Sequence, residues 1–363
     1  MNIVGATKAY ESWAGKRIDL VAADIELKHE FMSKAAFPFM RATFYRWATN
    51  WAEICPELAL APTLLAVGDL HVENFGTWRD AEGRLIWGIN DFDEAFSMPY
   101  TIDLVRLATS ALLAVEGNAL AVEPRDACAS ILAGYREMIG RHHGGPFVLE
   151  ESHPAMRAMA LGEERDPVRF WSKLGQFKRV NAPGIVRRLL QKQLPDDAAS
   201  PRYVHRVAGL GSLGRPRFVA LADWGGGFVA REAKALLPSA YTWANKLRAK
   251  EIYYEAIIDA AARVPDPFLK TKKGWLLRRL APHCTRIELD DFPRKRDERH
   301  ILKAMGTETA NVHFGSPDAL QQVRHDLRRR GTTWLYEAAR KMTACVLDDW
   351  KEWRTATQRR VRR

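Results

Sequence analysis

The chain has 363 residues, of which 47% are hydrophobic and 27% charged, a balance typical of a folded globular protein that excludes global disorder. This length is enough for two domains or for one large unit with two lobes. Lys and Arg number 55 against 44 Asp and Glu, and the formal net charge of +11 favours anionic partners, although a solvated basic surface is the simpler explanation of the bulk charge.

The cysteines and apolar stretches exclude further classes. Four cysteines are widely spaced and form no C-x-x-C pair, so neither a disulfide framework nor a zinc site is indicated. The N-terminus lacks the uninterrupted apolar core of a signal peptide, and the most apolar long stretch, 104–122, contains Arg106 and Glu116. We therefore expect no membrane partner and a cytoplasmic location.

The first part of the chain alternates between helices, strands and polar loops. Residues 20–60 read as helical, and 64–67 form a short apolar run that predicts a buried strand ending at Gly68. Residues 85–89 predict a second strand, and 79–83 between them carry a turn signal. Each of the two strands is followed by a loop rich in polar side chains.

These two loops carry the chemistry. In the first, Asp69 is followed five residues later by Asn74, and the second contains Asp91. A carboxylate, an amide and a second carboxylate can fill the three polar roles of phosphoryl transfer. Asp69 would orient the attacking hydroxyl, while Asn74 and Asp91 would hold Mg²⁺, which prefers hard oxygen ligands. A single loop Asp usually caps a turn, but the combination favours a functional site.

His71 and Asp93, which lie in the same loops, each have two interpretations. His71 could contact a phosphate, or Asp69 and His71 could be the first metal pair of a dinuclear metallophosphoesterase. The metallophosphoesterase needs further histidine ligands, and the other histidines lie in no obvious strand-end setting. Asp93 could bind the metal or brace the loop.

The middle of the chain is predicted to be helical and the next part rich in strands. Asp103 can cap a helix whose apolar face begins at Leu104. Residues 125–195 look mostly helical with a break near 142–146, and 195–201 is a plausible boundary. Beyond it we expect strands at 203–208, 217–222, 228–233 and 275–280, a helix over 240–263, and helices from about 300 to 358.

A glycine-rich segment, 209–214, joins two of these strands. Gly209, Gly211 and Gly214 form a G-x-G-x-x-G pattern that also contains Ser212, and as a bare pattern it is weak. A strand follows it rather than a helix, which argues against a dinucleotide fold and favours a lid over nucleotide phosphates. Glycines let backbone N–H groups approach phosphate closely. The alternative is a plain hairpin turn.

A cation that could pair with phosphates follows on the next strand. Arg231 and Lys234 are three positions apart, so they face opposite sides of a strand and only one can point into a cleft. We expect Arg231 to be that residue. Glu251, or Glu255 one turn later, lies on the apolar stripe of the predicted helix and is expected to pair with Arg231, because a buried carboxylate needs a partner. A solvated strand edge and a partly exposed helix flank are the alternatives.

The densest basic run is the C-terminal one, 354–363, which contains Arg359, Arg360, Arg362 and Arg363. We interpret it as a frayed end. Nucleic-acid binding through it is only weakly supported, because no aromatic residues lie between these arginines.

The motifs resemble those of known phosphotransferases. Residues 67–74 resemble the catalytic loop of the aminoglycoside and choline kinase branch of the protein-kinase-like superfamily, and 89–93 resemble its metal-binding Asp motif. Residues 99–104 are similar to the segment that follows, in which an Asp buttresses the catalytic loop. More closely, the chain resembles the bacterial family called domain of unknown function 2252. This resemblance runs over most of the length, including 68–76, 90–95 and 209–214.

The resemblance implies a two-lobed α+β kinase-like fold in circularly permuted order, because Gly209 follows Asp69 by 140 residues instead of preceding it. A mainly helical large lobe would comprise 1–198 and 298–363, and a small β-rich lobe would comprise 199–297. The implied activity is transfer of phosphate from ATP, with Mg²⁺, to a hydroxyl of an unidentified small molecule or protein. Since Arg231 stands where Lys is usual, a catalytically inactive nucleotide-binding or interaction module is the alternative.

Overall fold

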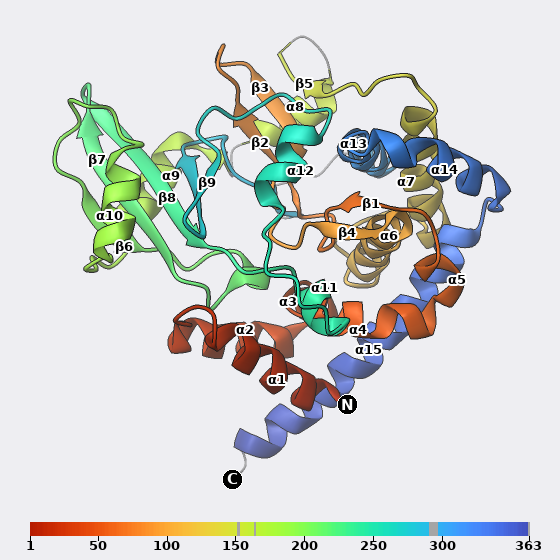
Figure 1. Ribbon diagram of the computed structural model, residues 1–363. Helices are drawn as coiled ribbons and strands as arrows, with labels where there is room; N and C mark the ends of the chain where they lie inside the picture. Colours follow the sequence, from red (N-terminus) through yellow and green to blue (C-terminus); the bar gives the residue numbers. More distant parts are fainter. Residues whose placement is uncertain (151–152, 163–164, 290–296, 362–363) are drawn as a thin grey trace.

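The computed structural model describes residues 1–150, 153–162, 165–289 and 297–361. Figure 1 shows a five-stranded sheet on one side, most of the helices on the other, and two smaller sheets between them. The α+β class predicted from the sequence is confirmed. None of the helices in these described ranges has the length and apolar character that crossing a bilayer requires.

The N-terminal region is helical, as predicted, and leads into two small sheets. Strands β1 and β4 pair antiparallel, and β2, β3 and β5 form the three-stranded sheet. The elements are α1 (Ile3–Gly15), α2 (Ala22–Lys34), α3 (Ala36–Ala42), α4 (Phe44–Ile54), α5 (Pro56–Ala59), β1 (Thr63–Ala66), β2 (Phe75–Arg79), β3 (Leu85–Ile89), β4 (Phe96–Pro99) and β5 (Phe147–Val148).

A group of packed helices surrounds α6, which is buried from Tyr100 to Ala114. A helix that is apolar on nearly all sides can only lie inside a core, and α6 packs against α7, α13 and α15. These helices lie on the right of Figure 1, and the long α15 extends past the body near the N-terminus. Their bounds are α6 (Tyr100–Glu116), α7 (Pro124–Ile139), α8 (Pro154–Ala160), α13 (Glu298–His313), α14 (Pro317–Arg329) and α15 (Trp334–Val361).

Two glycines allow α7 and α13 to come into backbone contact. A methyl group on Gly134 of α7 would lie 1.9 Å from the carbonyl oxygen of Lys303, and one on Gly306 of α13 would lie 2.0 Å from the carbonyl oxygen of Ile131. Neither neighbour is a movable side chain. The absence of a Cβ at these two positions therefore sets the closeness of the two helices.

We expect Gly134→Ala to destabilise the protein by about 1–3 kcal/mol, because the two helices must separate to admit the methyl group. This loss exceeds the gain in helix propensity of about 1 kcal/mol that Ala has over Gly. Gly331→Ala is the matched control, since nothing lies within 4 Å of the added methyl group there. Denaturant unfolding of the two variants and the parent measures the difference, and equal midpoints would contradict the prediction.

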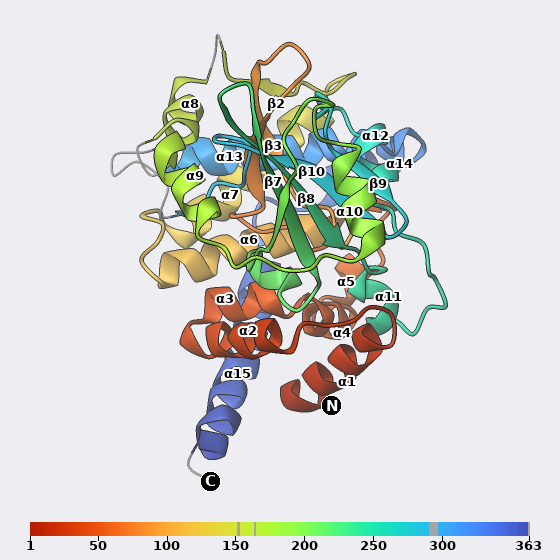
Figure 2. The same ribbon diagram turned by 90° about the vertical axis from the view of Figure 1, so that its left-hand side faces the viewer.

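The five-stranded sheet has the antiparallel order β6-β7-β8-β10-β9. Side chains alternate between its faces: Val219 and Leu221 of β7 pack with Leu174 of α9, while Ala220 and Ala222 pack with α10 on the other face. Figure 2 looks onto this sheet and its two helices. The elements of this region are α9 (Pro167–Gly175), α10 (Gly184–Gln191), β6 (Arg202–His205), β7 (Arg217–Trp224), β8 (Gly227–Ala235), β9 (Lys270–Lys272) and β10 (Trp275–Leu280).

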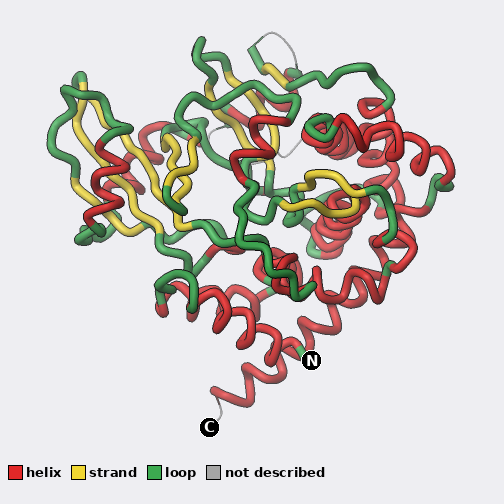
Figure 3. Tube along the Cα trace, viewed as in Figure 1, coloured by secondary structure: helices red, strands yellow, loops and turns green. Residues whose placement is uncertain are grey.

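The packing of this sheet begins earlier in the chain than the predicted small lobe, 199–297. Helices α9 and α10, which precede residue 199, cover its two faces. Conversely, α11 (Ala240–Ala244) lies within the predicted small lobe but packs against α4 of the helical part. Residues 236–239 connect β8 to α11, and Figure 3 shows the loops between the five-stranded sheet and the helical part.

The helix predicted over 240–263 is wrong in its middle. Two short helices occur instead, α11 and α12 (Tyr254–Ala260). Lys246 has a φ of 54°, and the N–H of Leu247 bonds to the carbonyl of Thr242 at 2.8 Å. A hydrogen bond that spans six residues, with the last residue but one in the left-handed region, is the Schellman motif, which terminates helices.

The frayed C-terminus predicted from residue 354 is also wrong as far as Val361, because α15 continues to that residue. The Arg354 guanidinium lies 4.9 Å from the ring centre of Trp350 in the same helix. Arg362 and Arg363 lie outside the described residues.

Candidate active site

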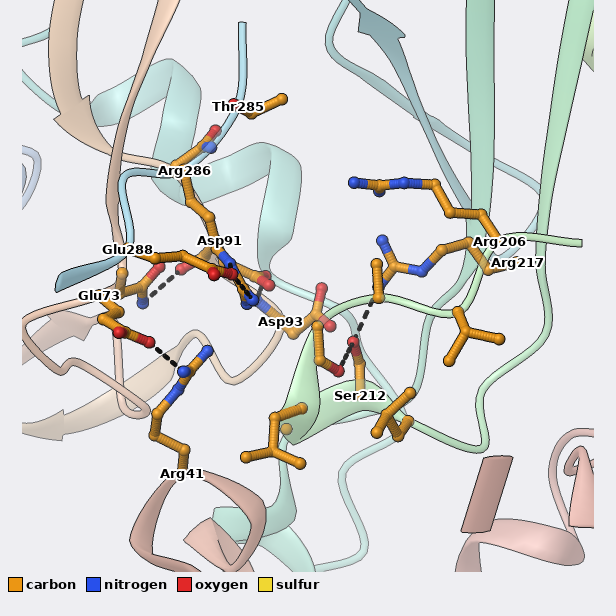
Figure 4. A pocket seen from close by; sticks show the side chains of 18 of the residues that line it. Arg41, Glu73, Asp91, Asp93, Arg206, Ser212, Arg217, Thr285, Arg286 and Glu288 are labelled. Carbon is orange, nitrogen blue, oxygen red and sulfur yellow. Dashed lines mark hydrogen bonds and ion pairs between the residues drawn. The ribbon is translucent and has the colours of Figure 1, made fainter. Parts of the chain in front are cut away.

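A cavity of about 800 Å³ lies where the five-stranded sheet meets the helical part. Figure 4 shows side chains from both sides pointing into this space, with Arg206 and Arg217 from the sheet and Glu73, Asp91 and Asp93 from the opposite side. Of the residues predicted as a site, the structure brings these to the cavity lining: Asp69, His71, Asn74, Asp91, Asp93, Gly209, Gly211 and Ser212.

The loop that carries Asp69 is held in place by hydrogen bonds to the side chain of Asp103. The two carboxylate oxygens of Asp103 accept hydrogen bonds from the N–H groups of Val67 and Gly68, each at 2.8 Å. His313 lies 3.0 Å from the same carboxylate and 2.9 Å from the Tyr135 hydroxyl. The predicted buttressing role of Asp103 is therefore confirmed. Its predicted role as a helix cap is wrong, because α6 begins three residues before it.

Arg106 of α6 orients the carboxylate of Asp69. Its Nε and Nη2 atoms donate to Oδ1 of Asp69 at 2.8 and 2.5 Å, and Nη2 also donates to the carbonyl of Met40 at 2.9 Å. The Arg106 side chain is fully buried, and its guanidinium lies 5.0 Å from the ring centres of both Phe44 and Trp47. Because both bonds use Oδ1, the other oxygen of Asp69 is left to face the cavity and the glycine-rich segment.

Asn74 connects the two polar loops. Its Nδ2 donates to the carbonyls of Asp69 and Asp91, each at 3.1 Å. These two bonds fix the orientation of the amide, because only the nitrogen can donate. The remaining atom, Oδ1, is buried, and no donor among the described residues bonds to it. A buried carbonyl oxygen in this state is suited to a cation ligand.

Asp91 and Asp93 face a lysine that comes from the sheet. The Nζ atom of Lys234 lies 3.3 Å from the Asp91 carboxylate and 2.6 Å from that of Asp93. The other oxygen of Asp93 accepts from Arg215 at 3.1 Å. Both oxygens of Asp93 are thus engaged by cations of the protein, which favours the bracing interpretation of this residue over the metal-binding one.

The surroundings shift the pKa values of these two carboxylates in opposite directions. Burial alone would raise the pKa of Asp91, but the ammonium of Lys234, together with the Asp93 carboxyl group and two nearby guanidinium groups, lowers that pKa below its usual range. Burial, and the charge of Asp91 beside it, raise the pKa of Asp93. Asp91, which is ionised at neutral pH, is the better cation ligand of the two. Among the described residues, no three His, Cys, Asp or Glu side chains gather as metal ligands.

The glycine-rich segment lies directly against Asp69. A methyl group on Gly211 would lie 3.2 Å from Oδ2 of Asp69 and 3.0 Å from the carbonyl of Arg41. Gly209 and Gly214 have φ values of 76° and 94°, which a residue with a Cβ rarely adopts. Close approach and backbone conformation together require glycine here. The predicted proximity of this segment to the Asp69 loop is confirmed.

Next to the glycine-rich segment, three arginine side chains pair with one shared carboxylate. Glu232 of β8 is fully buried and lies 2.7 to 2.9 Å from nitrogens of Arg206, Arg217 and Arg278. Burial would raise the pKa of Glu232, but these three guanidinium groups lower it well below its usual range. Arg217 also donates to the Ser212 hydroxyl at 2.9 Å. The sheet therefore presents surplus positive charge to the cavity beside Ser212.

The expected pairing of Arg231 with Glu251 is wrong. Arg231 points to the other face of the sheet, where it donates to the carbonyl of Gln193 at 2.8 Å and stacks on Phe268. Glu251 lies in the loop between α11 and α12 and accepts from the N–H of Lys250 at 2.9 Å. The strand alternation correctly allows only one of Arg231 and Lys234 into the cleft, and that residue is Lys234.

His71 lies on the cavity wall among arginines. It is 7% exposed, and its Nδ1 is buried without a hydrogen bond from the described residues. Burial lowers its pKa well below the ordinary value, and the charges of Arg41 and Arg106 lower it further. His71 is therefore neutral at physiological pH. Next to it, Glu73 pairs with Arg41 and accepts from the N–H of Leu289 at 3.1 Å.

Three charged residues at or directly behind the cavity wall were not predicted as site residues: Glu94, Arg106 and Lys234. Glu94 accepts from Arg215 at 2.9 Å and from the N–H of Ala240 at 2.5 Å. Burial raises its pKa to about 7 despite Arg215. Arg106 was visible in the sequence only as a charge in an apolar stretch, although an isolated charge in such a stretch indicates a buried partner. The sequence prediction placed the side chain of Lys234 on the wrong face of β8.

Residues 20–165 match the model of a family described as an uncharacterized protein conserved in bacteria, DUF2252. The match contains the Asp69 and Asp91 loops and ends before the glycine-rich segment, so it is shorter than the resemblance expected from the sequence. No curated protein matches the chain, and no solved structure matches it.

Proposed function

We propose that this protein transfers the γ-phosphate of ATP, with Mg²⁺, to a hydroxyl group of a small molecule or protein, on a two-lobed kinase-like scaffold in permuted order. One observation carries the proposal. Asp69, Asn74 and Asp91 open into the same cavity as a glycine-rich segment that is 140 residues away in the chain. A carboxylate for the acceptor, oxygen ligands for a cation and close-packed backbone amides are the parts that phosphoryl transfer needs.

The residues fit a magnesium ion. The buried Oδ1 of Asn74 accepts nothing from the described residues, and Asp91 supplies an ionised carboxylate. These two residues would hold the ion, which, when bound, neutralises charge on the phosphates. Lys234 is held by Asp91 and Asp93 at the same place, so its ammonium is positioned to add to this neutralisation.

The charge of the cavity suits a polyphosphate. Among the described residues, its lining has ten Lys and Arg side chains against seven Asp and Glu. Arg206 and Arg217 point into this space from the sheet. Their charges are only partly balanced by the shared Glu232. Phosphate oxygens can satisfy these guanidinium groups. In the glycine-rich segment the N–H groups of Ser212 and Leu213 already donate to carbonyls of the segment, so a phosphate would meet the N–H groups of its other residues.

In the reaction that follows, an acceptor hydroxyl lies beside the free oxygen of Asp69. The hydroxyl oxygen forms a bond to the γ-phosphorus, its proton passes to Asp69, the bond to the β–γ bridging oxygen breaks, and ADP leaves. Arg106 holds Asp69 in one orientation for this role. Positioning and charge stabilisation account for most of the acceleration in such sites.

An active enzyme is favoured over an inactive module. Inactivity was suggested by an arginine, Arg231, at the position where a lysine is usual. A lysine, Lys234, contacts Asp91 and Asp93 from the sheet and could take that role in place of Arg231. The sequence-based reason for lost catalysis therefore falls away.

We expect Asp91→Ala to abolish the magnesium dependence of ATP binding, because the variant lacks the ionised ligand. Even outer-shell partners of a metal ion change its affinity by about 10–100-fold, so loss of a direct ligand should lower the affinity for Mg-ATP by at least roughly tenfold. Calorimetric titration with ATP, with and without Mg²⁺, measures this. Asp259→Ala, an exposed position on α12, is the control. An Asp91→Ala protein that binds Mg-ATP like the parent would remove the metal site from the proposal.

A further inference from the structure

Lys28 of α2 is a buried cation on the wall of the cavity. It is 4% exposed and belongs to the buried stripe of α2 with Asp24 and Met32, at spacings of four residues. Asp24 is already engaged by His205 at 3.0 Å. Among the described residues, no carboxylate forms an ion pair with Lys28, and the ring centre of Tyr45 lies 5.8 Å from its Nζ atom.

A buried ammonium without a counter-ion is unfavourable. Burial, helped by the charge of Arg215, lowers the pKa of Lys28 to about 8, and the carboxylates of Glu11, Glu94 and Asp69 limit this lowering. Lys28 is thus mostly protonated at neutral pH and carries a charge that the folded protein does not pair. An anion that enters the cavity is the missing partner.

The glycine-rich segment places Lys28 near the proposed chemistry. At one end of the segment, Gly211 lies against Asp69. At the other end, the carbonyl of Gly214 accepts from the N–H of Val21 at 2.8 Å. A methyl group on Gly214 would lie 2.2 Å from the Ile25 side chain, which is one helical turn before Lys28. Asp69 and Lys28 therefore lie beside the two ends of one short segment.

The walls of this corner are largely apolar. Leu27, Phe31, Phe37 and Tyr45 line the same cavity as Lys28. They offer contact surface to a carbon skeleton, although the rings of Phe31 and Phe37 also lie near the cations of Lys34 and Arg41. Lys28 therefore lies in a part of the cavity wall that is rich in apolar side chains.

We propose that this corner is the acceptor subsite, and that the Lys28 ammonium binds an anionic group, a carboxylate or a phosphate, on a small acceptor whose hydroxyl lies at Asp69. This inference rests on the proposed phosphotransferase function and specifies its substrate class. An acceptor of this kind is held at two points, its anion by Lys28 and its hydroxyl by Asp69, while its carbon skeleton packs on the aromatic wall.

The first test measures protection of Lys28 from acetic anhydride at pH 7.5, read by peptide mass spectrometry. Inorganic phosphate and acetate are added in separate arms, with chloride at equal ionic strength as reference. At about ten times the dissociation constant of the anion, labelling of Lys28 should slow by about tenfold. Labelling of Lys34, which is exposed on the same helix, should not change. Protection by phosphate alone indicates a phosphorylated acceptor and protection by acetate a carboxylate. Lack of protection by either overturns the proposal.

The second test compares Lys28→Met with Lys28→Arg by thermal unfolding. In the absence of ligand, Lys28→Met should melt at a higher temperature than the parent, because it removes an unpaired buried charge. The anion that protects Lys28 should raise the melting temperature of the parent and of Lys28→Arg more than that of Lys28→Met. Equal rises in all three proteins, or a lower melting temperature of Lys28→Met, would make Lys28 a structural residue.

A measurement of nucleotide binding distinguishes failure of this inference from failure of the proposed function. Lys28→Met should bind Mg-ATP with the affinity of the parent, since Lys28 lies on the acceptor side. If the parent fails to bind Mg-ATP, the phosphotransferase proposal fails whatever Lys28 does. If the parent binds Mg-ATP and neither anion protects Lys28, only the acceptor subsite fails.

Discussion

Glu232→Gln should be the most destabilising single substitution considered for this protein, with a loss of about 3–5 kcal/mol at neutral pH. The carboxylate is fully buried, and three arginines converge on it. Glutamine has nearly the same shape, so packing is kept while the negative charge that Arg206, Arg217 and Arg278 share is removed. Chemical denaturation of the parent and the variant measures the loss.

A control substitution makes this prediction specific. Asp223→Asn, at an exposed position on the neighbouring strand β7, should change stability by less than about 0.5 kcal/mol.

The dependence on pH is a second check. The pKa of Glu232 is depressed, so the stabilisation that its carboxylate gives is fully present above the unfolded pKa of 4.5 and is lost as the pH falls towards the folded pKa. The stability gap between parent and Glu232→Gln should therefore narrow below about pH 4.5. A variant no less stable than Asp223→Asn would show that the arginines do not depend on this carboxylate.

Strand β8, which carries Glu232, shows which features the sequence predicts and which it does not. The alternation of β8 correctly separates Arg231 from Lys234, because side-chain direction in a strand depends only on local geometry. Which face meets the cavity depends instead on the helices that cover the sheet, and α10 occupies the side of Arg231. That packing is set by residues 30 or more positions away, which periodicity within the strand does not reveal.

The Asp69 loop was more predictable because its chemistry is local. Asp69, Asn74 and Asp91 lie within 23 residues, and one hairpin, β2 with β3, brings them together. The partner that orients Asp69, in contrast, is Arg106 on a helix that is buried along most of its length. A charge in such a helix indicates a buried partner, but nothing in the sequence says which one.

The broken helix at 240–263 has a different cause. Its apolar positions do repeat at helical spacing, and Tyr254 on this stripe is buried, but Leu247 on the same stripe is exposed. The chain leaves the helix at Lys246, which adopts a left-handed conformation without being glycine or asparagine. Tertiary packing of α11 on α4 overrides the local preference here.

Asp69→Asn should lower the rate of phosphate release from ATP, with water as acceptor, by about 10²–10⁴-fold, while the affinity for Mg-ATP stays within a few-fold of the parent. The amide oxygen can still accept from Arg106 at the place of Oδ1. Its NH₂ group then faces the cavity and presents a donor where the acceptor hydroxyl needs an acceptor for its proton. Orientation is largely kept and the proton-accepting role is lost.

The split between rate and affinity is what distinguishes the roles of the two loops. Asp91→Ala should weaken Mg-ATP binding, whereas Asp69→Asn should leave it and reduce turnover. Because Arg106 is fully buried and loses its charged partner, Asp69→Asn must first be shown to be folded at the assay temperature by its unfolding transition. A folded Asp69→Asn protein that releases phosphate at the parental rate would leave Asp69 as the anchor of Arg106 alone. The acceptor would then be activated by some other group of the cavity.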